Sequence, residues 1–150
     1  MRVIDLKEET GYIEQYIHLR NSHIDMLLTS PVNKDDTMKW LERRDVEIRG
    51  VVDGDVLAGV VILYLGREGE VAFFAKDKNK GMGTRLLSII EDIARKMNLP
   101  FIWAWVLKDN KIAKHVFEKS GFLNDGVQTR EHDGILYDGV KYKKLLLQIH

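Results

Sequence analysis

Three consecutive runs of β-branched and other apolar residues most restrict the folds open to this chain. The runs span Val46–Val52, Val56–Tyr64 and Val71–Ala75, and only two short segments rich in Gly and charged residues, Asp53–Asp55 and Gly66–Gly69, separate them. Runs of this length between such segments are typical of strands joined by tight turns. The middle of the chain therefore predicts consecutive hairpin-joined strands. With the helical patterns on either side, this excludes both a strict alternation of strand and helix and an all-β fold.

Helical patterns lie on both sides of these strands. Apolar spacing and capping residues predict helices at Thr10–Arg20, Asn33–Arg44, Thr84–Met97 and Asn110–Ser120. Further strands are expected at Arg2–Leu6, Phe101–Leu107, Val127–His132 and Val140–Ile149, with turns at Asp133-Gly134 and Asp138-Gly139. This order predicts an α+β fold, in which helices cover both faces of a mixed, seven-stranded sheet.

Two finer expectations concern packing. In the helix at Thr84–Met97, one face carries four apolar residues and is expected to be buried; these are Leu86, Ile90, Ile93 and Met97. On the opposite face, Glu91 and Arg95, and likewise Asp92 and Lys96, have the i,i+4 spacing of ion pairs. Trp103 and Trp105 share one face of a strand, and core packing is the expected explanation.

The composition limits the kinds of partner. The 150 residues form about one domain, with no linker or repeat, so we expect a single domain over residues 1–150. The 23 basic residues balance the 23 acidic residues, so neither nucleic acid nor an anionic membrane is expected to bind. The absence of Cys excludes thiolate metal sites and a cysteine nucleophile, and no metal is expected. With neither a signal-peptide core nor the ~20 apolar residues of a membrane helix, we expect a cytoplasmic protein.

A glycine-containing turn joins the third of the central strands to the next helix. Its sequence, Lys78–Thr84, is KNKGMGT. A helix start has unpaired N–H groups and partial positive charge, and glycines let an anion approach them, so strand, glycine turn and helix together can hold phosphate. The turn is neither a P-loop, since Gly83 is not followed by Lys and Ser or Thr, nor a dinucleotide fingerprint, since Leu86 stands where a small residue is needed. A plain loop with a glycine hinge is the alternative.

A second motif follows in the right order. Lys78–Gly83 is similar to the Q/R-x-x-G-x-G/A pyrophosphate loop of the GNAT superfamily of N-acetyltransferases. Asn110–Phe122, NKIAKHVFEKSGF, resembles the N-x-x-A-x-x-L/V-Y-E-K-x-G-F signature of the same superfamily. The close resemblance covers about residues 70–122, and the order of elements over the whole chain also matches.

The resemblance implies where acetyl-CoA would bind. The sheet would splay between its fourth and fifth strands, Val71–Ala75 and Phe101–Leu107, and the co-substrate would lie in the opening. The pantetheine would pair with the backbone at Phe73, and Asn110, which is also expected to cap its helix, would hydrogen-bond the amide region. Lys78 replaces the usual Gln or Arg and lacks the guanidinium fork. The pyrophosphate would rest on the amides of Lys80, Gly81, Met82, Gly83 and Thr84.

The resemblance also implies direct attack of an amine on the thioester. Glu70 matches a position used as general base in some members, although an ordinary charged turn is the alternative, and His23 is a second candidate. Phe117 stands where most members carry a tyrosine that can protonate the leaving thiolate. Either another group serves, such as Tyr137 or Tyr142, or the thiolate leaves without an acid.

The acceptor is the least defined part of the prediction. Loops at Arg20–Pro31 and Thr129–Gly139 are expected to select it. We expect a small-molecule amine, with an amino sugar as one candidate, and a homodimer is compatible with the sequence. Two alternatives stay open: a non-catalytic acyl-CoA-binding sensor domain and a protein N-terminal acetyltransferase.

Overall fold

One mixed sheet forms the middle of the molecule in the computed structural model, which describes residues 1–77 and 81–146. Within these residues the strands are β1 (Arg2–Asp5), β2 (Val46–Asp53), β3 (Val56–Tyr64), β4 (Glu70–Ala75), β5 (Phe101–Leu107), β6 (Leu123–His132) and β7 (Ile135–Leu145). The helices are α1 (Ile13–Asn21), α2 (Ile24–Leu27), α3 (Lys34–Leu41), α4 (Met82–Lys96) and α5 (Lys111–Lys119), with 3-10 turns η1 (Thr10–Tyr12) and η2 (Leu65–Arg67). The sheet order is β1-β2-β3-β4-β5-β7-β6, so the predicted seven-stranded α+β architecture is confirmed.

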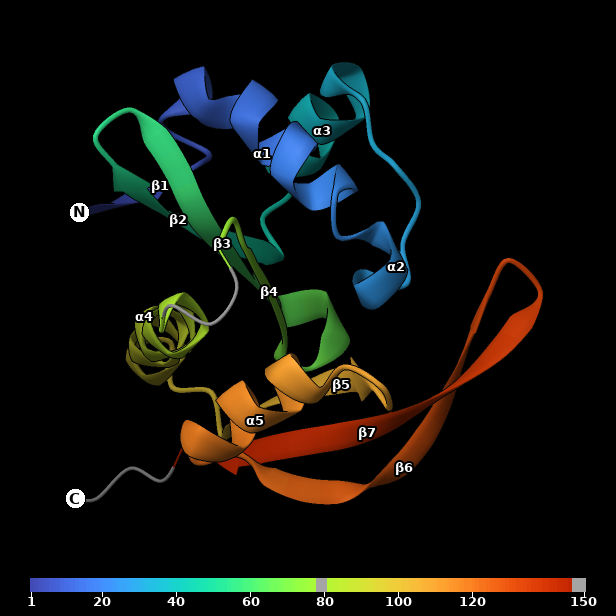
Figure 1. Ribbon diagram of the computed structural model, residues 1–150. Helices are drawn as coiled ribbons and strands as arrows, with labels where there is room; N and C mark the ends of the chain where they lie inside the picture. Colours follow the sequence, from blue (N-terminus) through green and yellow to red (C-terminus); the bar gives the residue numbers. More distant parts are fainter. Residues whose placement is uncertain (78–80, 147–150) are drawn as a thin grey trace.

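The sheet separates two groups of helices, with α1–α3 over one face and α4 and α5 over the other (Figure 1). Strand β3 shows why its sequence is apolar throughout. Successive side chains of a strand point to opposite faces. Accordingly, Val60 and Ile62 pack under α1, while Val61 and Leu63 pack under α4. Both faces of the central strands are therefore buried, which explains the uninterrupted apolar runs.

Helix α4 packs its apolar side against β2–β5. The predicted buried face is correct at Leu86 and Ile90, but Met97 is exposed and Leu87 and Ala94 are buried instead. The helix ends at Lys96, so Met97 is its C-cap and no longer follows the helical face. On the outer side, Glu91 accepts a hydrogen bond from Arg95 at 3.1 Å, as predicted, whereas the ion pair predicted between Asp92 and Lys96 is not among the ion pairs of the described residues.

The sheet opens between β4 and β5. These two strands are parallel and share a single residue pair, Glu70 with Trp103, beside one hydrogen bond from the Trp103 N–H to the Gly69 carbonyl at 3.1 Å. Beyond this pair the strands diverge, so the splay predicted between the fourth and fifth strands is confirmed. Because both strands point the same way, the helices that follow them, α4 and α5, begin at the open end.

The β6–β7 hairpin extends well beyond the rest of the molecule (Figure 1, orange and red). Its tip is the predicted Asp133-Gly134 turn, with φ of 51° and 79°, the left-handed conformation that two-residue hairpin turns require. The turn predicted at Asp138-Gly139 is wrong, because Gly139 lies inside β7. A Cβ on Gly139 would come within 2.1 Å of the Trp105 ring, so this glycine makes room for the indole.

The predicted core position of the two strand tryptophans is also wrong. Trp103 and Trp105 are only half-buried and belong to neither of the two core clusters. The Trp105 Nε1–H donates to the Gln128 carbonyl at 2.6 Å, and the Trp103 Nε1–H donates to the Arg67 carbonyl at 2.9 Å. The two indoles therefore form part of a polar boundary, not part of the core.

Candidate active site

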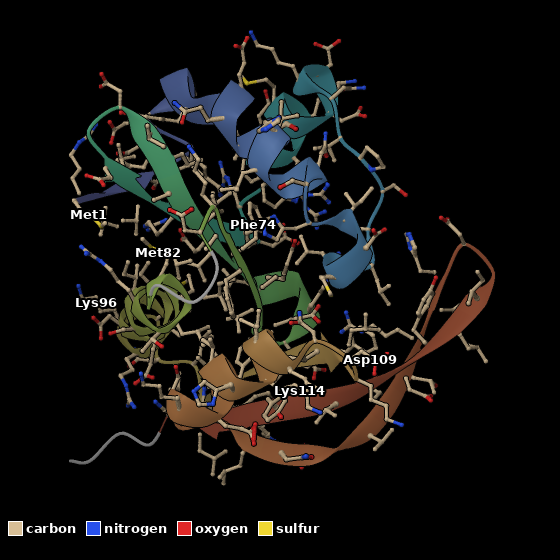
Figure 2. The ribbon with its side chains drawn as sticks, in the orientation of Figure 1. Met1, Phe74, Met82, Lys96, Asp109 and Lys114 are labelled. Carbon is tan, nitrogen blue, oxygen red and sulfur yellow. The ribbon has the colours of Figure 1, made fainter. Side chains whose placement is uncertain are left out.

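Two cavities meet at the splay between β4 and β5. The first has a volume of about 720 Å³ and lies between α4, α5 and α2, and the second, of about 460 Å³, lies under α1 and α3. Three residues that line the first cavity are labelled in Figure 2: Met82 of α4, Phe74 of β4 and Asp109 in the turn before α5. Six residues line both cavities, namely Met26, Leu27, Phe73, Phe74, Asn110 and Ala113. A ligand in one cavity can thus meet a ligand in the other across the splay.

The N-terminus of α4 opens onto the first cavity. Gly81, in the left-handed conformation at φ 74°, is its N-cap, and the first helical bond runs from the Arg85 N–H to the Gly81 carbonyl at 3.2 Å. The N–H groups of the first turn therefore have no hydrogen-bond partner within the helix itself. Among the described residues no side chain caps this end and its first turn holds no acidic residue, so the arrangement fits an anion such as pyrophosphate. Lys78 and Lys80, predicted to contact it, lie outside the described residues.

Gly83 also has a packing role that the sequence did not predict. Gly83 is buried, and a Cβ there would lie 2.8 Å from the Phe73 ring and 3.0 Å from Val116. The absence of a side chain therefore lets α4 approach β4 and α5. The side chain of Met82 packs on Gly59 of β3, and Met82 and Gly83 both line the first cavity. Thr84 lines the first cavity, and its contact with pyrophosphate stays a prediction.

Phe73 and Asn110 lie where the two cavities join. The backbone of β4 pairs with β3 through Phe73 and Val61, while on the β5 side no described strand pairs with it beyond Glu70. This free edge could hold an extended ligand by strand-like hydrogen bonds. Asn110 is the N-cap of α5, as predicted, and its Oδ1 accepts from the Ala113 N–H at 3.1 Å. Its contact with a co-substrate stays a prediction.

Glu70 borders the second cavity and is not a solvated turn residue. Its side chain is only 6% exposed and lies between two guanidinium groups. Arg67 Nη1 is 3.3 Å from Oε1, and Arg130 Nη2 donates to Oε2. Any proton that Glu70 accepts must therefore bind an oxygen already shared with an arginine.

The local sequence did not reveal Arg130. It belongs to the β6–β7 hairpin, 60 residues from Glu70, and no motif marks it. Only the stacking of β6 and β7 beside β5 brings it to the cavity. The sequence indicated Arg130 only indirectly, through the prediction that the Thr129–Gly139 region, which contains it, contributes to the acceptor site.

Aromatic rings form the wall of the second cavity. Tyr16 and Trp40 stack with centroids 6.1 Å apart, and Trp40 is 6.4 Å from Tyr64. Burial raises the pKa of both tyrosines, so their hydroxyls stay neutral at physiological pH. The wall is thus largely uncharged, and the formal charges of this cavity come from a few Arg, Asp and Glu side chains.

His23 lines the first cavity just before α2, a short helix that the sequence did not predict. Its Nδ1 lies 2.9 Å from the Leu19 carbonyl oxygen, and its ring is 5.9 Å from that of Phe74. Because a carbonyl only accepts, this contact assigns the proton to Nδ1 and leaves Nε2 as an acceptor. His23 is therefore a second group that could accept a proton near the splay.

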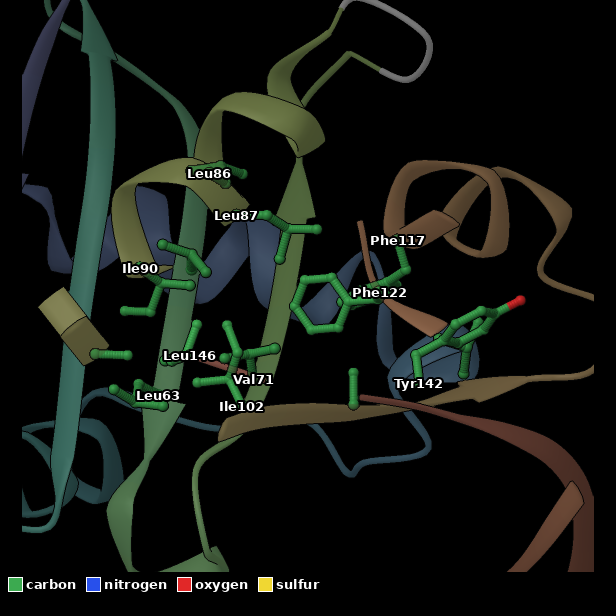
Figure 3. Close-up of a cluster of buried hydrophobic side chains, with 14 of the residues drawn as sticks. Leu63, Val71, Leu86, Leu87, Ile90, Ile102, Phe117, Phe122, Tyr142 and Leu146 are labelled. Atoms are coloured by element: carbon green, nitrogen blue, oxygen red, sulfur yellow. The ribbon is translucent and has the colours of Figure 1, made fainter. Parts of the chain in front are cut away.

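Phe117 is buried beside Phe73, Phe122 and Tyr142 (Figure 3). The ring is 5.4 Å from that of Phe73 and stacks on Tyr142 at 5.9 Å. The Tyr142 hydroxyl points away from this cluster and donates to Glu118 at 3.3 Å, and Tyr142 lines neither cavity. Burial, then the Glu118 carboxylate, raise the pKa of this hydroxyl. Tyr142 is therefore poorly placed to replace the missing tyrosine acid.

Restoring a hydroxyl with Phe117→Tyr is expected to change kcat by less than about threefold. A thiol with a pKa near ~8.5 leaves readily, so a general acid adds little to its departure. The new hydroxyl is expected to cost about 1–3 kcal/mol of unfolding free energy if no partner satisfies it. Steady-state kinetics and urea denaturation test both effects. A rise in kcat approaching 100-fold would show instead that proton donation to sulfur limits turnover.

Comparison with known proteins identifies the class. Residues 13–122 match the model of the acetyltransferase (GNAT) family, so the chain belongs to this family, and it is an N-acetyltransferase. The resemblance inferred from the two sequence motifs is confirmed.

One protein similar in sequence and two solved structures similar in fold illustrate what this chain resembles. A Bacillus subtilis protein named "Putative phosphinothricin acetyltransferase YwnH" is 29% identical over 124 residues, covering 73% of this chain and 76% of that protein. Salmonella typhimurium yncA, solved with its cofactor acetyl-CoA, superposes with a TM-score of 0.82 at 17% identity, covering 99% and 95% of the two chains. Vibrio cholerae spermidine N-acetyltransferase, solved with CoA and spermine, gives a TM-score of 0.78 at 19% identity, covering 96% and 94%.

No helix among the described residues is long and apolar enough to cross a bilayer. In the same residues, no group of three or more His, Asp or Glu side chains could hold a metal ion.

Proposed function

We propose that this chain transfers the acetyl group of acetyl-CoA to the primary amine of a small molecule. The observation that carries the proposal is the meeting of two cavities at the β4–β5 splay, with the uncapped N-terminus of α4 at the open end. Acetyl-CoA would occupy the first cavity, with its pyrophosphate on the amides of residues 81–84 and its pantetheine along β4 at Phe73. The amine would enter from the second cavity.

The reaction needs a neutral amine at the thioester carbon. The nitrogen forms a bond to this carbon, the carbon–sulfur bond breaks, and the amine loses one proton while CoA leaves as a thiolate. An amine with a pKa near ~10.4 is almost wholly protonated at neutral pH, so a base must accept its proton. Glu70 is the group in the second cavity that we assign to this role, acting directly or through a water molecule.

The name of the Bacillus subtilis relative supports a small-molecule acceptor, because it specifies phosphinothricin. The second cavity, of about 460 Å³, is lined on several sides by aromatic and charged side chains, which favours a compact acceptor over a protein N-terminus. A non-catalytic acyl-CoA sensor is the rival function, and the missing tyrosine at Phe117 is the feature that favours it.

An acetyl-transfer screen tests the proposal. Acetyl-CoA is incubated with amino acids, amino sugars, polyamines and short peptides, and CoA release is measured with a thiol reagent, which no cysteine of this chain can disturb. We expect turnover with at least one small amine. Tight acetyl-CoA binding by calorimetry without turnover of any amine would favour the sensor.

A further inference from the structure

We propose that Arg67 and Arg130 select the acceptor by binding an anionic group next to its amine, so that the acceptor is a small zwitterion of the amino acid type. This inference rests on the proposed function and adds the substrate class. Its starting point is the charge of the second cavity, which is lined by four arginines, Arg20, Arg43, Arg67 and Arg130, but by only two acidic residues, Asp36 and Glu70. An excess of positive charge disfavours a polycationic acceptor.

Two of the four arginines are committed to other contacts. Arg20 donates to Thr29 Oγ1 at 2.7 Å and to the Ser30 carbonyl at 3.0 Å, and so fixes the segment before α3. Arg43 forms a two-point ion pair with Asp45 at 2.9 and 2.6 Å. The remaining pair, Arg67 and Arg130, flanks Glu70.

Each of these two guanidinium groups keeps donors for a ligand. A guanidinium carries five N–H donors. Within the described part of the chain, Arg67 and Arg130 each donate through one nitrogen, in both cases to Glu70. Their side chains are 59% and 31% exposed, whereas Glu70 is buried, so the donors that remain face the cavity and solvent.

Aromatic rings hold both guanidinium groups in place. Arg67 lies 4.2 Å above the Tyr64 ring, and Arg130 lies 5.1 Å from the Trp105 ring and 5.6 Å from that of Trp103. A guanidinium stacked on a ring keeps its N–H edges free for hydrogen bonds in the plane. The two arginines are thus pre-oriented, which lowers the entropy lost when they bind an anion.

The row Arg67–Glu70–Arg130 matches the charges of a zwitterion. An ammonium group can bind Glu70, while an anionic group one or two bonds further along the molecule can bind either flanking arginine bidentately. The row lies at the closed end of the splay, where Glu70 still pairs with Trp103. Such an acceptor would therefore be held by its two charges with the amine on the side of the thioester.

The experiment compares matched acceptors. Amino acids, the corresponding amino amides, aminophosphonates and alkylamines are tested as acceptors for wild type, Arg67→Gln and Arg130→Gln. Wild type is expected to prefer the carboxylate over the carboxamide by about 10- to 100-fold in kcat/KM, as expected for charge-assisted hydrogen bonds, with the difference in KM. Each variant should lose most of this preference. An amino acid and its amide also differ in the pKa of the amine. The test is therefore the change in the carboxylate-to-carboxamide ratio of kcat/KM between wild type and each variant.

Lys143→Gln is the matched control, because it removes a positive charge from the same hairpin at a side chain that lies over Phe101 and lines neither cavity. The control should keep the wild-type preference. If Arg130→Gln folds poorly, the exposed Arg67→Gln decides the question. If aminophosphonates and amino acids react equally well, the arginines recognise negative charge of either geometry. If only amino acids react well, the arginines recognise the planar carboxylate.

The two proposals fail in different ways. Equal turnover of carboxylate and carboxamide by wild type and by both variants would overturn the anion site and leave acetyl transfer intact. Absence of all turnover would overturn the proposed function. In that case calorimetry of an amino acid and its amide on the CoA-saturated protein still tests the arginines, since the site predicts tighter binding of the carboxylate that Arg67→Gln abolishes.

Discussion

Glu70→Gln is expected to lower kcat by about 10²- to 10⁴-fold, which is the usual contribution of a general base. Gln keeps the shape of Glu and one oxygen that can accept from an arginine, but it cannot take up the proton of the amine. Acetyl-CoA affinity should be unchanged, because Glu70 lines only the second cavity. Steady-state kinetics measure the fall in kcat. Calorimetric titration with acetyl-CoA measures the fraction of the protein that is folded and binds it.

The control for this prediction is Glu68→Gln. Glu68 carries the same side chain two residues before Glu70, but it is exposed and lines neither cavity. Glu70→Gln also weakens a buried ion pair, so its melting temperature should fall, and kcat is referred to the folded fraction.

An unchanged kcat and an unchanged pH–rate profile in Glu70→Gln would contradict the assignment. The search would then pass to His23, whose Nε2 is an acceptor and whose ring borders the first cavity. His23→Gln would in that case be expected to lower kcat by about 10²- to 10⁴-fold. If neither variant lowered kcat, we would infer that a water molecule accepts the proton of the amine.

Thr84→Glu is expected to weaken acetyl-CoA binding by about 100-fold or more, because like charges brought together at a binding site cost several kcal/mol. Thr84 lies in the first turn of α4 and lines the first cavity. A carboxylate at this place would compete with pyrophosphate for the N–H groups of the turn. Calorimetric titration with acetyl-CoA measures the change in Kd.

This variant separates binding from folding. A negative charge in the first turn of a helix is favourable by about 0.3–1 kcal/mol, so the melting temperature should stay level or rise. Ser88→Glu adds the same charge one turn later, at an exposed residue that lines neither cavity, and should leave acetyl-CoA binding near wild type. If Thr84→Glu bound acetyl-CoA with unchanged Kd, the pyrophosphate would have to be placed elsewhere.

Gly83 is a poor choice for the same test. A side chain at Gly83 would meet the Phe73 ring and Val116, so a larger residue would disturb the packing of α4 against β4 and α5 before it met any ligand. Loss of acetyl-CoA binding in such a variant would therefore not show whether the side chain blocks the N–H groups at the start of α4 or displaces the helix.

Features set by neighbouring residues were predictable from the sequence. The apolar runs of β2–β4, the Asp133-Gly134 turn and the Asn110 cap depend on contacts within a few residues, which the sequence shows directly. The two motifs at Lys78–Gly83 and Asn110–Phe122 indicated the family, and with it the splay between β4 and β5.

Features set by distant residues became visible only in the tertiary structure. Arg130 reaches Glu70 across 60 residues, and Trp105 lies on Gly139, which the sequence alone made look like a turn. Gly83 makes room for Phe73 and Val116, a packing role that its place in the glycine turn did not reveal. Such contacts depend on which strands lie side by side, and a local pattern carries no record of the residue that will face it across the sheet.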